Sequence, residues 1–114
     1  KIEILNSVAT RDDANSRWLI DMTLKNSGSA DATVQSVRIN AKSLGTGSDS
    51  YYNGTDGLPT GGLTILAGQA KSFTITLSYY DATNAPNNPV SGADIEVKLH
   101  TPAGMDYPDW VTLP

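Results

Sequence analysis

Apolar and polar side chains alternate one by one along most of this chain of 114 residues. The clearest stretch covers residues 18–25, where Trp18, Ile20, Met22 and Leu24 are separated by mostly polar residues. Successive side chains of a β-strand point to opposite faces of the sheet. The pattern therefore predicts a strand with one buried face and one largely exposed face.

The same period of two recurs in six further segments of the chain. They cover residues 2–8, 36–41, 63–65, 72–79, 94–100 and 105–113. Clusters of Gly, Asn, Asp, Ser and Pro separate them, as expected of turns. No segment has helical apolar spacing over ten residues, so at most a single helical turn is expected. About seven short strands predict an all-β fold, an immunoglobulin-like antiparallel β-sandwich that forms one domain over 1–114.

Three features interrupt this regular pattern. Residues 45–62 are rich in Gly and Ser and predict one long surface loop, and residues 81–92, which carry two prolines, predict a second. Loops of this length are uncommon in compact domains and are often functional. Pro108 lies within the last predicted strand and has no amide donor. This strand is therefore expected at the edge of a sheet, or with a bulge at Asp109.

Composition and charge narrow the classes of function. The net charge is -4, and the eight Lys and Arg residues form no run. A basic face for phosphates or anionic lipid is therefore not expected. There is no cysteine, which excludes disulfides and thiolate chemistry, and only one histidine. A histidine-based zinc site is not expected, and neither is a cofactor.

The residues capable of catalysis do not form a recognisable motif. His100 is the only histidine available to a Ser–His–Asp arrangement, and no Gly-x-Ser-x-Gly sequence accompanies it. Alternation places His100 on the solvated face of its strand. The aspartates lie in predicted turns or near strand ends, without the spacing of a calcium loop. We therefore expect no enzyme, and a small hydrolase that uses His100 is the least favoured of three hypotheses.

The aromatic residues outside the predicted core are the candidate interaction residues. They are Tyr51, Tyr52, Tyr80, Tyr107 and Trp110. Exposed Tyr and Trp are frequent at the centres of protein interfaces. They could instead cover the two ends of the sandwich as amphipathic lids. In a second hypothesis, Trp110, Tyr107 and Tyr52 form the sugar platform of a carbohydrate-binding accessory domain.

One N-glycosylation sequon is present, Asn53-Gly54-Thr55. Because it falls inside the predicted loop over 45–62, Asn53 is expected to be accessible to a glycosylating enzyme.

Several segments resemble one family of surface proteins. Residues 4–8 and 18–26 (WLIDMTLKN) are similar to the opening strands of archaeal type IV pilin-like proteins, which include archaellins, adhesive pilins and archaellum stator proteins. Residues 65–75 resemble the connection in that family that places Gly-Gln before a strand, and residues 97–105 and 111–114 resemble its C-terminal hairpin.

The resemblance implies a non-catalytic extracellular head, located in the archaeal pseudoperiplasm or on a filament. Its expected partners are proteins, namely further copies of itself or a surface-layer protein. Members of the family have an N-terminal hydrophobic helix, whereas this chain opens at Lys1 with a predicted strand. We therefore expect that such a helix preceded Lys1 and that it provided the only attachment to a membrane.

Overall fold

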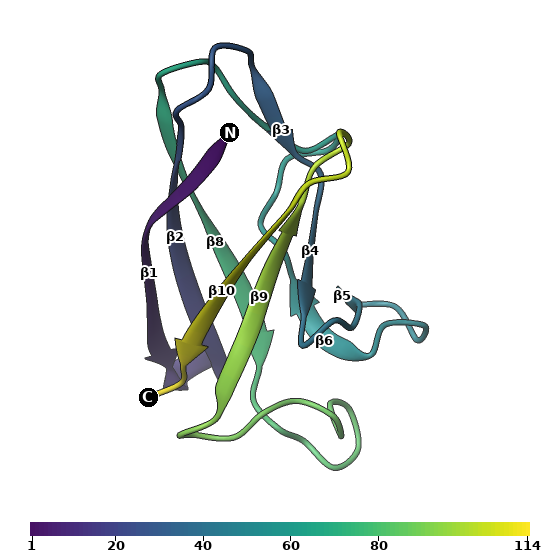
Figure 1. Cartoon of the computed structure of the whole chain (residues 1–114). Coiled ribbons are helices and arrows are strands. Elements are labelled where there is room, and N and C mark those ends of the chain that lie inside the picture. The colour runs from purple at the N-terminus through teal and green to yellow at the C-terminus, as the bar shows by residue number, and fades with distance from the viewer.

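Ten strands and one short 3₁₀ helix make up the structure, a computed structural model that describes all of residues 1–114 (Figure 1). The strands are β1 (Ile2–Asp12), β2 (Arg17–Asn26), β3 (Ala32–Val34), β4 (Ser36–Ile39), β5 (Leu44–Gly45), β6 (Tyr52–Thr55), β7 (Leu63–Ile65), β8 (Ala70–Ser78), β9 (Asp94–His100) and β10 (Asp106–Thr112). The 3₁₀ helix η1 covers Asp13–Asn15. No helix in the structure is long and apolar enough to cross a bilayer.

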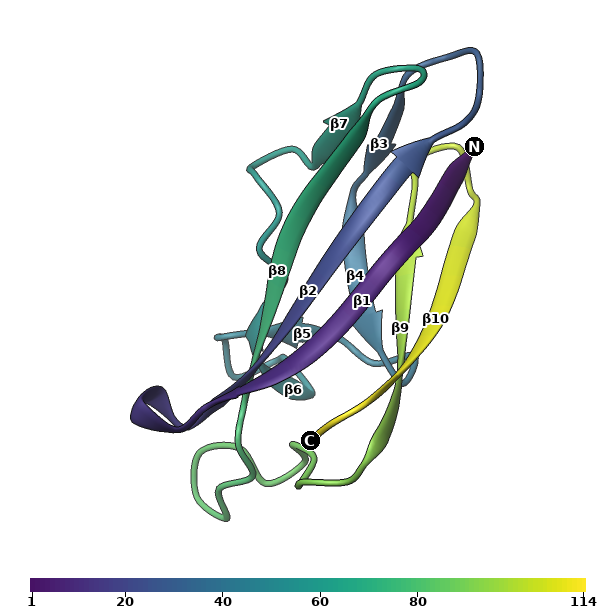
Figure 2. The same cartoon turned by 90° about the vertical axis from the view of Figure 1, so that its left-hand side faces the viewer.

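The strands form two main layers. The larger sheet has the order β1-β2-β8-β6-β5, and the smaller has the order β10-β9-β4. In Figure 1, β1, β2 and β8 lie on one side, and β10, β9 and β4 lie on the other. β3 and β7 pair separately near one end of the molecule (Figure 2). The predicted all-β class is confirmed, and the two layers are compatible with a β-sandwich.

The pairing differs in two details from the sequence prediction. There are ten strands instead of about seven, because β3, β5 and β6 were not predicted. All named strand pairs are antiparallel except β5 and β6, which run parallel. These additional strands have two to four residues each, too few for alternation to identify them.

The core lies between the two sheets and contains a cluster of 19 buried residues. The even positions of β2 that the sequence predicted to be buried, from Trp18 to Leu24, are each exposed by 2% or less. In the same sheet, Phe73, Ile75 and Leu77 of β8 lie directly opposite Met22, Ile20 and Trp18 of β2. Ile95, Val97 and Leu99 of β9 close the core from the other sheet. Period-two alternation therefore identified the buried faces of the long strands correctly.

A bulge in β1 changes the phase of the first strand. Ile4 lies opposite Leu24, and Asn6 lies opposite Thr23, so Leu5 is the additional residue. A bulge of this kind reverses the facing of all later residues. As a result Val8, predicted to continue the row of Ile2 and Ile4, is 43% exposed, and Leu5 is 55% exposed.

The position of β10 confirms the expectation from Pro108. β10 pairs only with β9 and forms an edge of the smaller sheet. Its register against β9 is continuous from Asp106 to Thr112, so there is no bulge at Asp109.

The prediction of one loop over residues 45–62 is wrong. β6 lies within this segment and pairs with β8, and Tyr52 and Gly54 are both buried. A side chain at position 54 would collide with the carbonyl oxygen of Thr76, so glycine lets β6 approach β8 closely. The third predicted strand is also shorter than expected, because Asn40 and Ala41 have φ of 49° and 63° and form a turn.

Candidate functional site

The five candidate aromatic residues do not form one surface. Tyr52 is only 6% exposed and belongs to the core, and its hydroxyl accepts a hydrogen bond from Asn40 Nδ2 at 3.1 Å. Tyr107 and Trp110 lie three positions apart on β10 and therefore face opposite sides of the sheet. The predicted sugar platform of Trp110, Tyr107 and Tyr52 is therefore wrong, as is the assignment of Tyr52 to an interface.

Trp110 is the most exposed large apolar residue of the molecule, at 66%. It lies on the outer face of the smaller sheet, opposite Glu96. In the next row of this face, Lys98 is opposite Arg38, so two positive charges lie side by side on neighbouring strands. Lys98 Nζ lies 3.7 Å from Glu96 Oε1, whereas Arg38 has no carboxylate within ion-pair distance.

His100 faces outward on the same sheet, as alternation predicted. Its side chain is 44% exposed, and its Nδ1 lies 2.7 Å from Asp106 Oδ1. Ser36 is opposite His100 on β4, but no hydrogen bond joins the two side chains. The His–Asp contact is thus a cross-strand surface pair, of the type that pins the register of neighbouring strands.

β1 and β10 form one flank of the molecule, and each has a strand neighbour on one side only. Figure 2 shows them side by side, at the edges of the two sheets. One side-chain hydrogen bond joins them, in which Ser7 Oγ donates to Asp109 Oδ2 at 2.6 Å. We call the two free strand edges, with the exposed side chains of Leu5, Val8 and Trp110, the β1–β10 flank.

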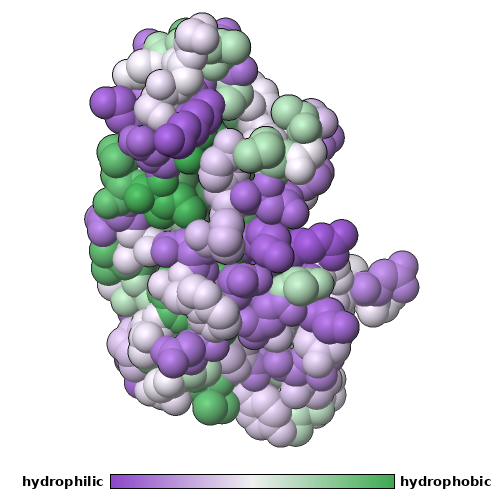
Figure 3. Space-filling model, viewed as in Figure 1, coloured by the Kyte–Doolittle hydropathy of each residue, from purple (hydrophilic) through white to green (hydrophobic).

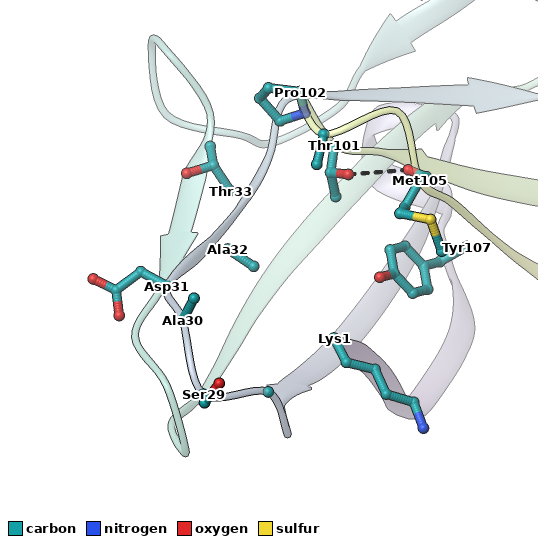
Figure 4. A pocket seen from close by; sticks show the side chains of 12 residues that line it. Lys1, Ser29, Ala30, Asp31, Ala32, Thr33, Thr101, Pro102, Met105 and Tyr107 are labelled. Carbon is teal, nitrogen blue, oxygen red and sulfur yellow. Dashed lines mark hydrogen bonds between the residues drawn. The ribbon is translucent and has the colours of Figure 1, made fainter.

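A groove with a volume of about 560 Å³ lies beside the start of β1. Its walls are the segment 28–33 and the turn between β9 and β10, and Tyr107 lies across from Ala30 and Ala32 (Figure 4). Thr101 Oγ1 donates to Met105 O at 3.1 Å and holds the turn. Hydrophobic surface also gathers near the beginning of β1 (Figure 3).

At the other end of β1, four side chains hold the β1–β2 hairpin against the body of the molecule. The Arg11 guanidinium lies 5.5 Å from the centre of the Trp18 ring and 5.7 Å from that of Tyr79. The Tyr79 hydroxyl donates to Asp13 Oδ1 at 2.7 Å, and Arg11 donates to the same oxygen. These hydrogen bonds, that from Tyr79 first, lower the pKa of Asp13.

Tyr51 lies in segment 46–51 before β6, Tyr80 lies in segment 79–93 after β8, and they are 44% and 51% exposed. The Tyr52 ring meets that of Tyr51 edge-on at 4.9 Å, and Lys42 Nζ lies 5.4 Å from the Tyr51 ring centre. Tyr80 is the second residue after the end of β8. Two hollows separate these tyrosines, and both are bordered by Asn53 and Asn84.

The sequon asparagine lies in strand β6 and not in a loop. Asn53 is half-buried, and its Nδ2 donates to Asn84 O at 3.4 Å. The accessible loop position predicted for the sequon is therefore wrong, and N-glycosylation of Asn53 stays a prediction.

The acidic residues are distributed over separate places. Asp12 Oδ2 accepts hydrogen bonds from Asn15 at 2.9 Å and Arg17 at 2.8 Å, and these bonds, that from Asn15 first, lower the pKa of Asp12. No group of three or more His, Cys, Asp or Glu side chains is arranged around a common point for a metal ion.

Sequence reasoning missed the asparagines that organise the loops. Asn84 borders both hollows, and Asn88 is 4% exposed with both polar atoms of its side chain hydrogen-bonded. The density of asparagine and proline over 84–89 was the available signal, but such residues are equally typical of any turn.

Comparison with known proteins adds no relative to this picture. No model of a protein family matches the chain, and no curated protein matches it. The resemblance to archaeal pilin-like proteins therefore remains a prediction from the residues quoted above.

Proposed function

We propose that this protein is a non-catalytic interaction module of a cell surface. It would be the extracellular head of an archaeal pilin- or archaellum-related protein that contacts sister subunits or the surface layer. The observation that carries the proposal is the β1–β10 flank, where an eleven-residue strand has a partner on one side only.

A free strand edge presents unpaired amide and carbonyl groups that can pair with a strand of another chain. The bulge at Leu5 and the missing amide of Pro108 each interrupt this capacity locally. The uninterrupted part of the edge is residues 6–12 of β1. A partner strand would therefore add to the larger sheet along this part.

Exposed apolar side chains frame this edge on both faces of the molecule. Val8 lies on the outer face of the larger sheet, opposite Asp21, and Trp110 lies on the outer face of the smaller sheet. Burial of a Trp side chain contributes strongly to binding at protein interfaces. A partner that covers the flank could contact both residues while it pairs with β1.

The rest of the larger sheet's outer face is rich in hydroxyl groups that bind one another. Thr23 Oγ1 and Ser72 Oγ are 2.9 Å apart, and Thr74 Oγ1 donates to Asp21. Cross-strand hydroxyl pairs of this kind stabilise a sheet and leave a polar surface. The polar groups of this face bind one another, whereas the flank has free strand edges and exposed apolar side chains. This difference supports the flank as the contact surface.

Photo-crosslinking on the native cell surface tests the proposal. Benzophenone-alanine is placed at Val8 in the full-length protein, and at Thr74 as a matched control on the outer face. We expect adducts at position 8 with a second copy or with a surface-layer protein, identified by mass spectrometry, and few adducts at position 74. Equal yields at both positions, or no protein adduct at position 8, would contradict the proposal.

A further inference from the structure

Segments 46–51, between β5 and β6, and 79–93, between β8 and β9, border a polar depression that is separate from the flank. One hollow of about 430 Å³ lies beside Tyr51, and another of about 360 Å³ lies beside Tyr80. Both are lined by Asn53, Asn84 and Ala85, so they adjoin across these residues. We call the two hollows together the asparagine cleft.

Asn88 fixes the shape of the cleft from beneath. Its Nδ2 donates to the carbonyl oxygens of Asn53 at 2.8 Å and Ser78 at 2.7 Å, and its Oδ1 accepts the amide of Asn53 at 3.0 Å. A buried side chain with all of these bonds holds the loop over 81–92 against β6 and β8. The cleft is therefore formed before any ligand arrives, which lowers the entropic cost of binding.

A tight turn fixes the other wall. The backbones of Asp81 and Ala85 exchange two hydrogen bonds, at 2.9 and 3.1 Å. Asp81 Oδ1 also accepts the amides of Asn84 and Thr83, and these bonds lower the pKa of its carboxyl group. Asp81 is the only charged residue that lines the cleft, and this carboxylate oxygen is already occupied.

The remaining polar lining groups are amides, hydroxyls and three tyrosines, Tyr51, Tyr79 and Tyr80. The Asn84 side chain makes no hydrogen bond within the protein, and Asn53 Oδ1 and the Tyr80 hydroxyl have none either. An amide presents a donor and an acceptor side by side, which matches a pair of neighbouring sugar hydroxyls. Tyrosine adds a flat apolar ring with a polar end, at low entropic cost.

We propose that the asparagine cleft binds a neutral oligosaccharide. Sugar rings would lie against Tyr51 and Tyr80, and their hydroxyls would bind the amide groups of Asn53 and Asn84 between them. The absence of Lys, Arg and Glu from the lining favours an uncharged ligand over an acidic one. The site goes beyond the proposed protein contact and shares no residue with the β1–β10 flank.

Titration followed by ¹H–¹⁵N NMR tests this proposal. The protein is produced in a host without N-glycosylation, so that Asn53 is unmodified, and the probes are maltohexaose, mannohexaose and cellohexaose. At least one probe should shift the amide signals of residues 46–53 and 80–88. Tyr80→Ala and Asn84→Ala should each weaken this binding about tenfold, equivalent to about 1.4 kcal/mol, whereas Trp110→Ala should leave it unchanged.

Several results would overturn the proposal. They are the absence of a shift with all three probes at millimolar concentration, an equal loss in Trp110→Ala, or equally strong binding of hexagalacturonate or hexaglutamate at the same signals. Asn84 is exposed and its side chain has no partner in the protein, so Asn84→Ala should fold even if Tyr80→Ala does not. Crosslinking from Val8 is independent of this site, so either proposal can fail alone.

Discussion

The buried polar residues show how single side chains replace missing strand pairs. Asn26 donates to Ala30 O and Ile65 O at 2.8 and 2.9 Å, and thereby connects the end of β2 to β7. Asn88 connects the loop over 81–92 to β6 and β8 in the same way. No buried side-chain polar atom is left without a partner. In sequence, both asparagines look like ordinary turn residues, because the difference lies in what surrounds them.

Asn88→Ala should destabilise the protein by about 2–3 kcal/mol, since it leaves part-buried backbone groups of Asn53 and Ser78 without partners. The neighbouring Asn87→Ala is the matched control, because Asn87 is exposed and its one bond, to Tyr51 O, is 3.3 Å long. Urea denaturation of both variants measures the difference. Equal midpoints for the two variants would show that Asn88 does not anchor the loop.

Asp81 should make part of the stability depend on pH. Its folded-state pKa is lowered by the amides of Asn84 and Thr83, so the unfolded chain, with a carboxyl pKa near 3.9, binds the proton more readily. The contribution is therefore complete above about pH 4 and is lost as the pH falls through the folded pKa. Melting temperatures from pH 2 to 7 should fall less steeply for Asp81→Asn than for the parent protein; parallel curves would exclude this contribution.

At the scale of elements, prediction succeeded where strands are long and failed where they are short. β2, β8 and β9 each present a row of three or more apolar residues, so their existence and their buried faces followed from alternation. β6 has only Tyr52 and Gly54 on its buried face, which cannot be distinguished from a loop before its partner β8 is known. The bulge in β1 was likewise invisible, because only the register against β2 reveals it.

Deletion of Leu5 should be tolerated. The residues on either side, Ile4 and Asn6, already face consecutive residues of β2, so the deletion would make the register continuous. We expect a change in unfolding free energy below about 1 kcal/mol, as for substitutions that leave the core intact. Deletion of Thr74 is the control, because β8 pairs with β2 without a break and should lose its register. Comparable losses in both deletions, measured by chemical denaturation, would refute the assigned bulge.

Arg38→Glu should stabilise the smaller sheet. Arg38 lies opposite Lys98, and like charges on directly opposite residues are unfavourable. The replacement creates a pair of opposite charges and should raise the unfolding free energy by about 0.2–1 kcal/mol. Arg38→Gln should give a smaller gain, and added salt should reduce both gains. A lower melting temperature for Arg38→Glu would mean that Arg38 has a favourable contact on this face.

At the scale of the whole molecule, the surfaces could not be predicted from sequence because they join distant segments. Tyr51 and Tyr80 border one cleft through Asn53 and Asn84, although 29 positions separate them. β1 and β10 come from opposite ends of the chain and form a single flank (Figure 2). Of the five aromatics predicted to lie outside the core, Tyr52 is buried and the other four are exposed or half-buried, but their grouping depended on the topology.

Hydrogen–deuterium exchange along β1 is the most direct test of the flank as a contact surface. The exchange of residues 6–12 is compared between the isolated protein and the same protein held in its native cell envelope. We predict slower exchange in the envelope for residues 6–12, with little change over the central strand β8. Unchanged exchange along residues 6–12, with new protection only elsewhere, would contradict the account.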